Sequence, residues 1–270
     1  MTSEPRMLLE TPLPPGRTIS SEDGSGVDQS FWLSDGPAPA GLWARICAEH
    51  ARTGLWPLLL DSRDPDDSEF RPWASGELSP ERMSSPGAHD PAELLAQWWG
   101  EYTVTGEDDD MLPPGERAAV TAPFGQRWPG LAPARAAGPD PDKEAAEYAE
   151  FFASLRPHVH LGLVPAASGA DALTAVGWDG PANYDNDTAK FSAVLRTWEQ
   201  RFGARVVAVG FDTLHLSIAT PPTEPQHALL VAAEHFAFCP DNIWQGSRPH
   251  TLTSYAERLV DAHSWEFWWD

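Results

Sequence analysis

The clearest hydrophobic pattern lies in the C-terminal half of the chain. Apolar residues recur at helical spacing through 187–202, and Gly203 follows as a helix terminator. The next stretch, RVVAVGF, is almost continuously apolar, which is typical of a central strand. TLHLSIA then alternates, with its leucines and isoleucine on the inward face and His215 on the outward face. The predicted strands lie near 158–164, 205–211, 213–219 and 265–269, and the predicted helices at 141–155, 187–202, 224–238 and 252–262.

The N-terminal half has a weaker pattern. Residues 1–38 are rich in Pro, Gly and Ser and are expected to be irregular, apart from a short strand at SFWLSDG. A helix is predicted at 40–53. The apolar LWPLLLD after it predicts a strand in which Pro57 indicates an edge position or a strand start. Another helix is predicted to begin after Asp90, where DPAE has the spacing of a capping box.

Residues 105–142 are rich in Pro, Gly and acidic side chains and are the best candidate for a domain boundary. We place the division near residue 138, which gives a Pro- and Gly-rich α/β region at 1–138 and a domain at 139–270. The expected fold class is α+β (mixed α/β). A mixed C-terminal sheet is flanked by helices, beside a less regular N-terminal α/β half.

The charge of the chain changes the range of expected partners. Forty acidic residues against 18 basic ones give a formal charge of −22 at pH 7. A field of this sign repels phosphate groups, so it argues against binding to nucleic acid or to an anionic membrane. It would attract a protein partner with a basic surface, although an acidic surface also serves solubility.

The expected location is the cytoplasm. No apolar run approaches the ~20 residues that a membrane span needs, and MTSEPRMLLETPLPPG lacks the pattern of a signal peptide. Cys47 and Cys239 are far apart in the sequence and form no disulfide framework, so reduced thiols are expected.

Three C-terminal segments together resemble a known family. It is domain of unknown function 4253, a group of bacterial proteins common in actinobacteria, and the resemblance covers roughly 128–270. The resemblance implies a bacterial, cytoplasmic, globular protein, and it implies no mechanism or catalytic residues. The segments are VLRTWEQRFGARVVAVGFDTL (194–214), AAEHFAFCPDNIWQG (232–246) and SWEFWWD (264–270), supported by WPGLAP (128–133) and GADALTAVGWDG (169–180).

The segment around Cys239 is the first candidate for chemistry. His235 lies four residues before the thiol and Asp241 two residues after it, so the three could supply a nucleophile and its base. Pro240 ends the preceding helix, however, and the negative end of the helix dipole disfavours a thiolate, although a protonated His235 could partly offset this. The alternative is that Cys239 packs in the core, as cysteine commonly does.

Four further residues are candidates for binding. Arg201 and Glu199 lie near a helix end, where the arginine could hold an anion; the alternative is pairing with the chain's own carboxylates. Trp244 and Trp268 are candidates for aromatic contact with a partner. Alternation in SWEFWWD predicts a terminal strand whose other aromatic residues point to the core while Trp268 points away.

No metal or cofactor is expected. His158 and His160 have the spacing of a ligand pair, and His215 could join them, but a fourth ligand is not defined. The acidic stretches at 61–67 and 107–110 do not have the spacing of a calcium-binding EF-hand loop. The common nucleotide-binding, hydrolase and zinc motifs are absent from the sequence.

Two functions follow as hypotheses. The leading one is a non-enzymatic cytoplasmic protein-binding module of regulatory or immunity type, whose acidic, tryptophan-rich surface engages a protein, with no role for nucleic acid or membrane. The alternative is an enzyme that uses Cys239 with His235. An accessible polar cleft at Cys239 would favour the enzyme, and a buried Cys239 would favour the binding module.

Overall fold

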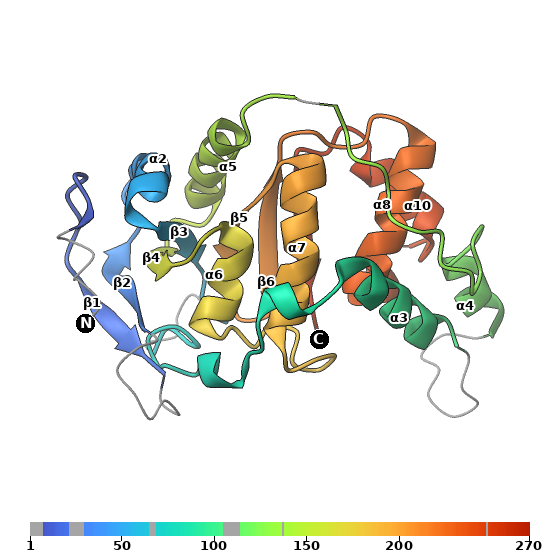
Figure 1. The fold of residues 1–270 in the computed structure, drawn as a ribbon, viewed down its shortest axis with the longest axis horizontal. Coiled ribbons are helices and arrows are strands. Elements are labelled where there is room, and N and C mark those ends of the chain that lie inside the picture. The colour runs from blue at the N-terminus through green and yellow to red at the C-terminus, as the bar shows by residue number, and fades with distance from the viewer. Residues whose placement is uncertain (1–7, 22–29, 65–68, 105–113, 137, 247) are drawn as a thin grey trace.

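The fold is α+β (Figure 1), and a computed structural model describes every residue except 1–7, 22–29, 65–68, 105–113, 137 and 247. The strands are β1 (Gly16–Ser20), β2 (Ser30–Pro37), β3 (Leu55–Leu60), β4 (His160–Pro165), β5 (Ala204–Val209), β6 (Thr213–Ile218) and β7 (Ser264–Trp268). The α-helices are α2 (Leu42–Thr53), α3 (Pro91–Thr103), α4 (Pro114–Val120), α5 (Pro141–Leu155), α6 (Gly169–Val176), α7 (Thr188–Phe202), α8 (Pro225–Phe238), α9 (Asp241–Trp244) and α10 (Leu252–Leu259), with 3-10 turns η1 (Pro80–Arg82) and η2 (Pro86–Ala88).

The strands form one mixed sheet in the order β1-β2-β4-β3-β5-β6-β7. Neighbouring strands are antiparallel except β3 and β5, which are parallel. Because β6 runs against both β5 and β7, strands β3, β5 and β7 point the same way and end at the same edge of the sheet. Residue 138, where the sequence predicts a domain boundary, lies along the chain between β3 and β4. These two strands are neighbours in the sheet.

The position of β3 corrects one expectation. Pro57 predicted an edge strand or a strand start, yet it is the third residue of a central strand. Proline lacks an N–H, and β3 pairs with β5 only at Leu59 and Leu60. On the β5 side, the Trp56 indole donates to the Val206 carbonyl oxygen at 3.0 Å. A side chain therefore supplies a hydrogen bond where the strand ladder is incomplete.

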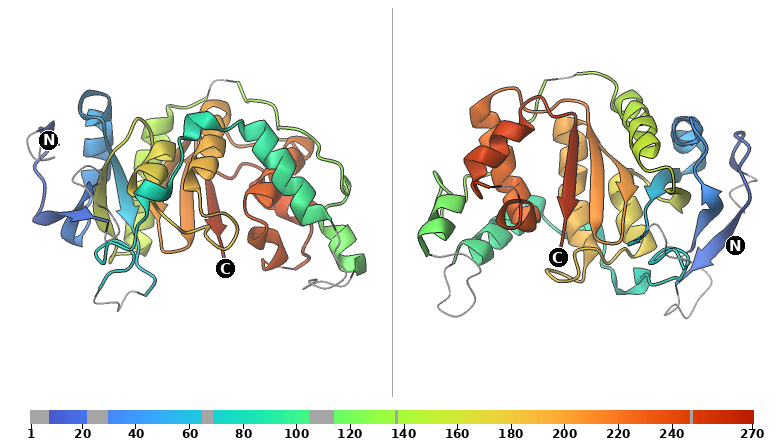
Figure 2. Two further views of the ribbon diagram at one scale, coloured as in Figure 1. Left: turned by 60° about the horizontal axis from the view of Figure 1, so that its bottom comes forward. Right: turned by 180° about the vertical axis from the view of Figure 1, so that it is seen from behind.

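Helices cover both faces of the sheet. In Figures 1 and 2, α6 and α7 lie over one face and α2 and α5 over the other, while α3, α8 and α10 gather beyond the β7 edge. Within the described residues, no helix is long and apolar enough to cross a membrane.

Most predicted elements of the C-terminal half are confirmed within one or two residues, including α5, α7, α8 and β4 to β7. In the N-terminal half, α2, β2 and the cap of α3 are confirmed; Asp90 Oδ1 accepts from the N–H groups of Ala92 (2.8 Å) and Glu93 (3.1 Å). Strand β1 lies in the region expected to be irregular. Its sequence GRTIS has one buried apolar residue, Ile19, and one such residue gives no detectable period.

A buried ion pair fixes the chain that leads into the C-terminal half. Glu234 is completely buried, and both of its carboxylate oxygens accept from Arg201, at 2.6 and 2.8 Å. The same carboxylate accepts from the Ala132 N–H (2.7 Å) and from the Trp198 indole (2.8 Å). A buried carboxylate is stable only with several donors, so this arrangement holds the extended segment around Ala132 against α7 and α8.

Candidate functional site

Cys239 lies at the end of α8 and is completely buried. Its thiol donates to the Trp268 carbonyl oxygen at 2.9 Å and contacts Asn242 Oδ1 at 3.5 Å. Burial raises the pKa of the Cys239 thiol well above its usual range. The surroundings therefore favour the neutral thiol, as the packing interpretation of this cysteine requires.

His235 does not share a side-chain hydrogen bond with Cys239 among the described contacts; their link is the backbone bond from Cys239 N to His235 O (2.8 Å). The imidazole is completely buried among Trp198, Trp265 and Phe267, and its Nδ1 lies 3.0 Å from the Tyr255 hydroxyl. Burial, with the positive charge of Arg201, lowers the pKa of His235 well below its ordinary value. His235 is thus a neutral core residue.

Asp241 and Asn242 tie the turn after α8 to the edge strand β7. The Asn242 amide donates to the Glu266 carbonyl oxygen at 2.6 Å, and its oxygen accepts from the Trp268 N–H at 3.1 Å. Asp241 is buried and accepts from the Tyr184 hydroxyl (2.7 Å) and the Asp270 N–H (3.1 Å). These contacts satisfy the free backbone groups of an edge strand, and they join two of the segments that carry the family resemblance.

The four candidate binding residues are not brought into one site. Arg201 is engaged by Glu234, and Glu199 accepts from the Ala170 N–H at 3.1 Å, where it caps α6. Trp244 packs against Phe236 and Tyr102, and the backbone of Trp268 is held by Cys239 and Asn242. Pairing of Arg201 with the chain's own carboxylates is confirmed.

The three histidines have separate partners. His158 Nε2 lies 2.9 Å from Asp61 Oδ1, and His160 Nδ1 lies 2.8 Å from the Ser34 carbonyl oxygen. His215 is buried against Phe152, and burial lowers its pKa to about 4. In the part of the chain that the structure describes, no three His, Cys, Asp or Glu residues are placed to hold a metal ion. The acidic stretch at 107–110 lies outside the described residues.

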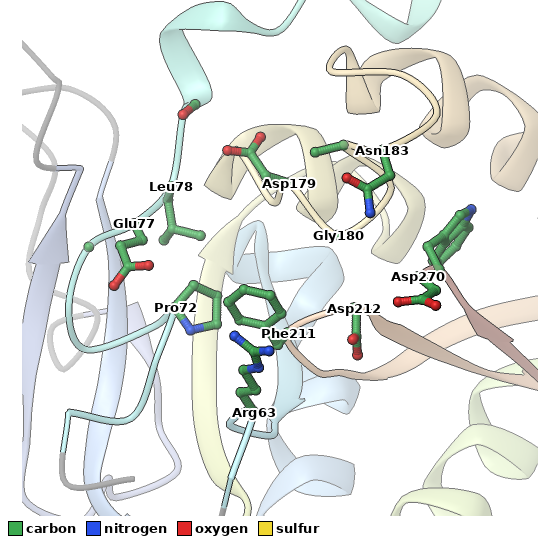
Figure 3. Close-up of a pocket in the computed structure, with 14 residues that line it drawn as sticks. Arg63, Pro72, Glu77, Leu78, Asp179, Gly180, Asn183, Phe211, Asp212 and Asp270 are labelled. Carbon is green, nitrogen blue, oxygen red and sulfur yellow. The ribbon is translucent and has the colours of Figure 1, made fainter.

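A pocket of about 560 Å³ opens at the edge of the sheet where β3, β5 and β7 end (Figure 3). We call it the carboxyl-edge pocket. Its volume is within the range of small-molecule sites, and the crevice beyond the carboxyl ends of parallel strands is where open sheets commonly bind ligands. Its charged and polar wall residues are Arg63, Glu77, Ser79, Asp179, Asn183, Asp212 and Asp270.

Two contacts bring the walls of this pocket together. The buried Trp178 indole donates to the carbonyl oxygens of Gly210 (2.9 Å) and Phe211 (3.2 Å), which joins the α6–α7 loop to the β5–β6 turn. Gly177 has a φ of +69° and accepts from the Ser79 N–H at 2.9 Å; a Cβ at this glycine would lie 2.0 Å from a Pro80 backbone atom. Glycine is therefore required where the wall around Ser79 meets the end of α6.

Two carboxylates of the pocket are perturbed. Burial raises the pKa of Asp179, against the stabilising effects of Ser79 and Arg82. Burial also raises the pKa of Asp212, with a further contribution from the nearby charge of Asp270 and an opposing one from Arg63. Neither Asp179 nor Asp212 belongs to an ion pair within the described residues, whereas Glu77 is bound by Arg71 through two bonds of 2.6 Å. Carboxylates with raised pKa in a cleft mark a candidate site.

This pocket could not be predicted from the sequence. Its three aspartates occur singly, in WDG, GFD and the final WD; they lie within segments that carry the family resemblance, but none belongs to a known catalytic or binding motif. The only signal was position, since Asp212 closely follows a continuously apolar strand. That signal becomes useful only once the strand order shows that β3, β5 and β7 end together.

The fold and this pocket define an α+β protein with a ligand-sized cleft at the carboxyl edge of its sheet. Residues 160–270 match the family described as Domain of unknown function (DUF4253), which confirms the resemblance over this part of the chain, although its start was predicted near 128. The match includes Asp179, Asp212 and Asp270, whereas Arg63 and Glu77 precede it. Searches of curated proteins and of solved structures found no match.

Proposed function

We propose that the protein is a non-enzymatic binding module, of regulatory or immunity type, whose carboxyl-edge pocket receives a positively charged group from a protein partner with a basic surface. The observation that carries this proposal is the pair Asp179 and Asp212, two perturbed carboxylates that line a 560 Å³ pocket without an ion-pair partner among the described residues. A bound cation would favour their charged forms.

The charge of the whole chain supports the same partner chemistry. A net charge of −22 steers cationic groups toward the protein, and a concave site focuses that field. Nucleic acid and anionic membranes would be repelled for the same reason. A charge-assisted contact inside a partly dry pocket is stronger than one on an open surface, so the pocket and not the general surface should determine affinity.

The surroundings of Cys239 support a binding role over the alternative enzyme. The thiol is buried and donates its hydrogen to a backbone oxygen, and His235 is held by Tyr255. We expect Cys239 to react with an alkylating reagent only after unfolding. Rapid labelling of Cys239 in the folded protein below pH 8, with Cys47 followed as an internal control, would favour the enzyme.

The proposal is tested by calorimetric titration with N-acetyl-L-argininamide and N-acetyl-L-lysinamide, each of which presents one positive charge. We expect saturable binding of at least one probe to the native chain. Asp212→Asn and Asp179→Asn should each weaken it at least fivefold, because one charged contact in a screened pocket is worth about 1–4 kcal/mol.

The matched control is Glu147→Gln, which removes the same charge from an exposed residue of α5. It should leave the affinity unchanged. Equal weakening by Glu147→Gln and Asp212→Asn would show that the probes respond to net charge alone, and no binding of either probe would also count against the pocket.

A further inference from the structure

One cation of the chain itself already lies in the carboxyl-edge pocket. The guanidinium carbon of Arg63 lies 5.2 Å from the centre of the Phe211 ring, and Figure 3 shows the guanidinium beside that ring. The positive charge of Arg63 also acts on Asp212. Arg63 is the only Lys or Arg among the described residues that line the pocket. An aromatic face next to a carboxylate is a favourable environment for a guanidinium.

The side chain of Arg63 is weakly held in this position. It is exposed, and among the described residues its guanidinium forms no ion pair, although the chain has a large excess of carboxylates. Its main chain is held independently, since Arg63 N–H donates to the Arg71 carbonyl oxygen at 3.3 Å. The side chain can therefore leave the Phe211 ring without loss of the loop's backbone anchor.

Phe211 itself is fixed more firmly than Arg63. It follows β5 in the turn whose carbonyl groups accept from the Trp178 indole, and Trp178 is completely buried. The aromatic face and Asp212 are thus held in place by the core, and the cation over them is exchangeable. Such a surface is preorganised to bind a planar cation, and it retains its shape when one cation replaces another.

We infer that the group received by the pocket is an arginine guanidinium of the partner, and that Arg63 is an internal competitor which occupies the same place on Phe211 beside Asp212 until the partner displaces it. The inference rests on the proposed function and adds two properties to it. A guanidinium stacks on an aromatic face and binds a carboxylate through two bonds, so arginine should bind more tightly than lysine. Removal of Arg63 should make the pocket more accessible to the partner's arginine.

The experiment compares three probes by calorimetric titration: N-acetyl-L-argininamide, N-acetyl-L-lysinamide and the neutral isostere N-acetyl-L-citrullinamide. The native chain should bind the arginine probe at least fivefold more tightly than the lysine probe. Arg63→Gln should strengthen binding of the arginine probe at least threefold, and Phe211→Leu should remove the preference for arginine over lysine. The citrulline probe should bind at least tenfold more weakly than the arginine probe.

The matched control is Arg45→Gln on α2, an exposed arginine that does not line the pocket and whose loss changes the net charge by the same amount. An equal gain of affinity in Arg45→Gln and Arg63→Gln would overturn the inference that Arg63 competes for the pocket. Weaker or unchanged binding in Arg63→Gln, or lysine binding as tightly as arginine, would overturn it as well. These outcomes are distinct from failure of the proposed function, in which Asp212→Asn leaves the affinity for both cationic probes intact.

Discussion

Two groups of carboxylates in this protein have opposite surroundings. Glu234 is completely buried and accepts from Arg201, the Ala132 backbone and the Trp198 indole. Asp179 and Asp212 are partly buried at the carboxyl-edge pocket, form no ion pair among the described residues, and have a raised pKa. The structural carboxylate is thus the one that has a charged partner within the chain, and the carboxylates available to a protein partner are those without one.

The two groups differ in whether a charged donor is supplied: Glu234 is paired with Arg201, whereas the side-chain donors to Asp179 and Asp212 are the uncharged Ser79 and Trp268. The donors to Glu234 come from α7 and from the segment around Ala132, so the carboxylate, which lies on α8, is a structural link between these three parts of the chain. The folded chain leaves Asp179 and Asp212 with a desolvation penalty that a ligand can relieve. Stability should depend on the first group, and binding on the second.

The largest expected effect on stability is at the buried ion pair of Glu234 and Arg201. Glu234→Ala should lower the free energy of unfolding by about 3–5 kcal/mol, because it leaves the Arg201 guanidinium without its carboxylate in the interior. Urea unfolding followed by tryptophan fluorescence measures this change. Glu147→Ala, at an exposed position, should change stability by no more than about 0.5 kcal/mol. Similar losses in both variants would contradict a structural role specific to Glu234.

The buried histidine His215 should give a smaller effect that depends on pH. Burial lowers its pKa to about 4, from about 6.5 in an unfolded chain, so the unfolded state binds the proton more readily. The contribution of the neutral His215 imidazole to the free energy of unfolding is fully present above pH 6.5 and is lost as the pH falls from 6.5 toward 4. At pH 5 the loss is about 2 kcal/mol relative to pH 7.

His215→Gln isolates this contribution, because glutamine does not titrate. The difference in unfolding free energy between the native chain and His215→Gln should shrink by about 2 kcal/mol between pH 7 and pH 5. Urea denaturation at the two pH values measures it. A difference independent of pH would show that the imidazole is not held neutral against Phe152.

The smallest effect on stability is expected at the carboxyl-edge pocket. Its sign is opposite to that at Glu234, because loss of the charge is not expected to destabilise the fold. A carboxylate with a raised pKa opposes folding when it is charged, so its contribution weakens stability as the pH rises through its folded pKa. Asp212→Asn at pH 7 should therefore leave stability unchanged or raise it by about 0.5 kcal/mol or less, since both carboxylates are partly exposed and screened. A loss above about 1 kcal/mol would place Asp212 with the structural carboxylates.

Much of the fold could be predicted from the sequence because apolar residues recur with a clear period along many of its helices and strands. Strands β5 and β6 and helix α7 follow from apolar spacing, and the alternation of SWEFWWD predicted the buried Trp265, Phe267 and Trp269. The central position of β3 could not be predicted, since the hydrogen bond from Trp56 beside Pro57 depends on the neighbouring strand.

The candidate site was much less accessible to sequence reasoning. The Cys239 segment attracts attention because rare residue types are close together in the sequence, yet its contacts brace β7. The pocket residues Asp179, Asp212 and Arg63 come from separate loops, and only the sheet order brings them together. Similarly, Glu234 and Arg201 lie on different helices, and their pairing depends on how α7 and α8 pack.

Carboxyl footprinting tests the central claim most directly. The folded chain is treated with a carbodiimide and glycine ethyl ester, with and without N-acetyl-L-argininamide, and labelling of each Asp and Glu is measured by mass spectrometry. The probe should protect Asp212 and Asp179 at least threefold while leaving the exposed Glu147 unchanged. Equal protection of all three carboxylates, or of none, would contradict a specific cation site at the carboxyl-edge pocket.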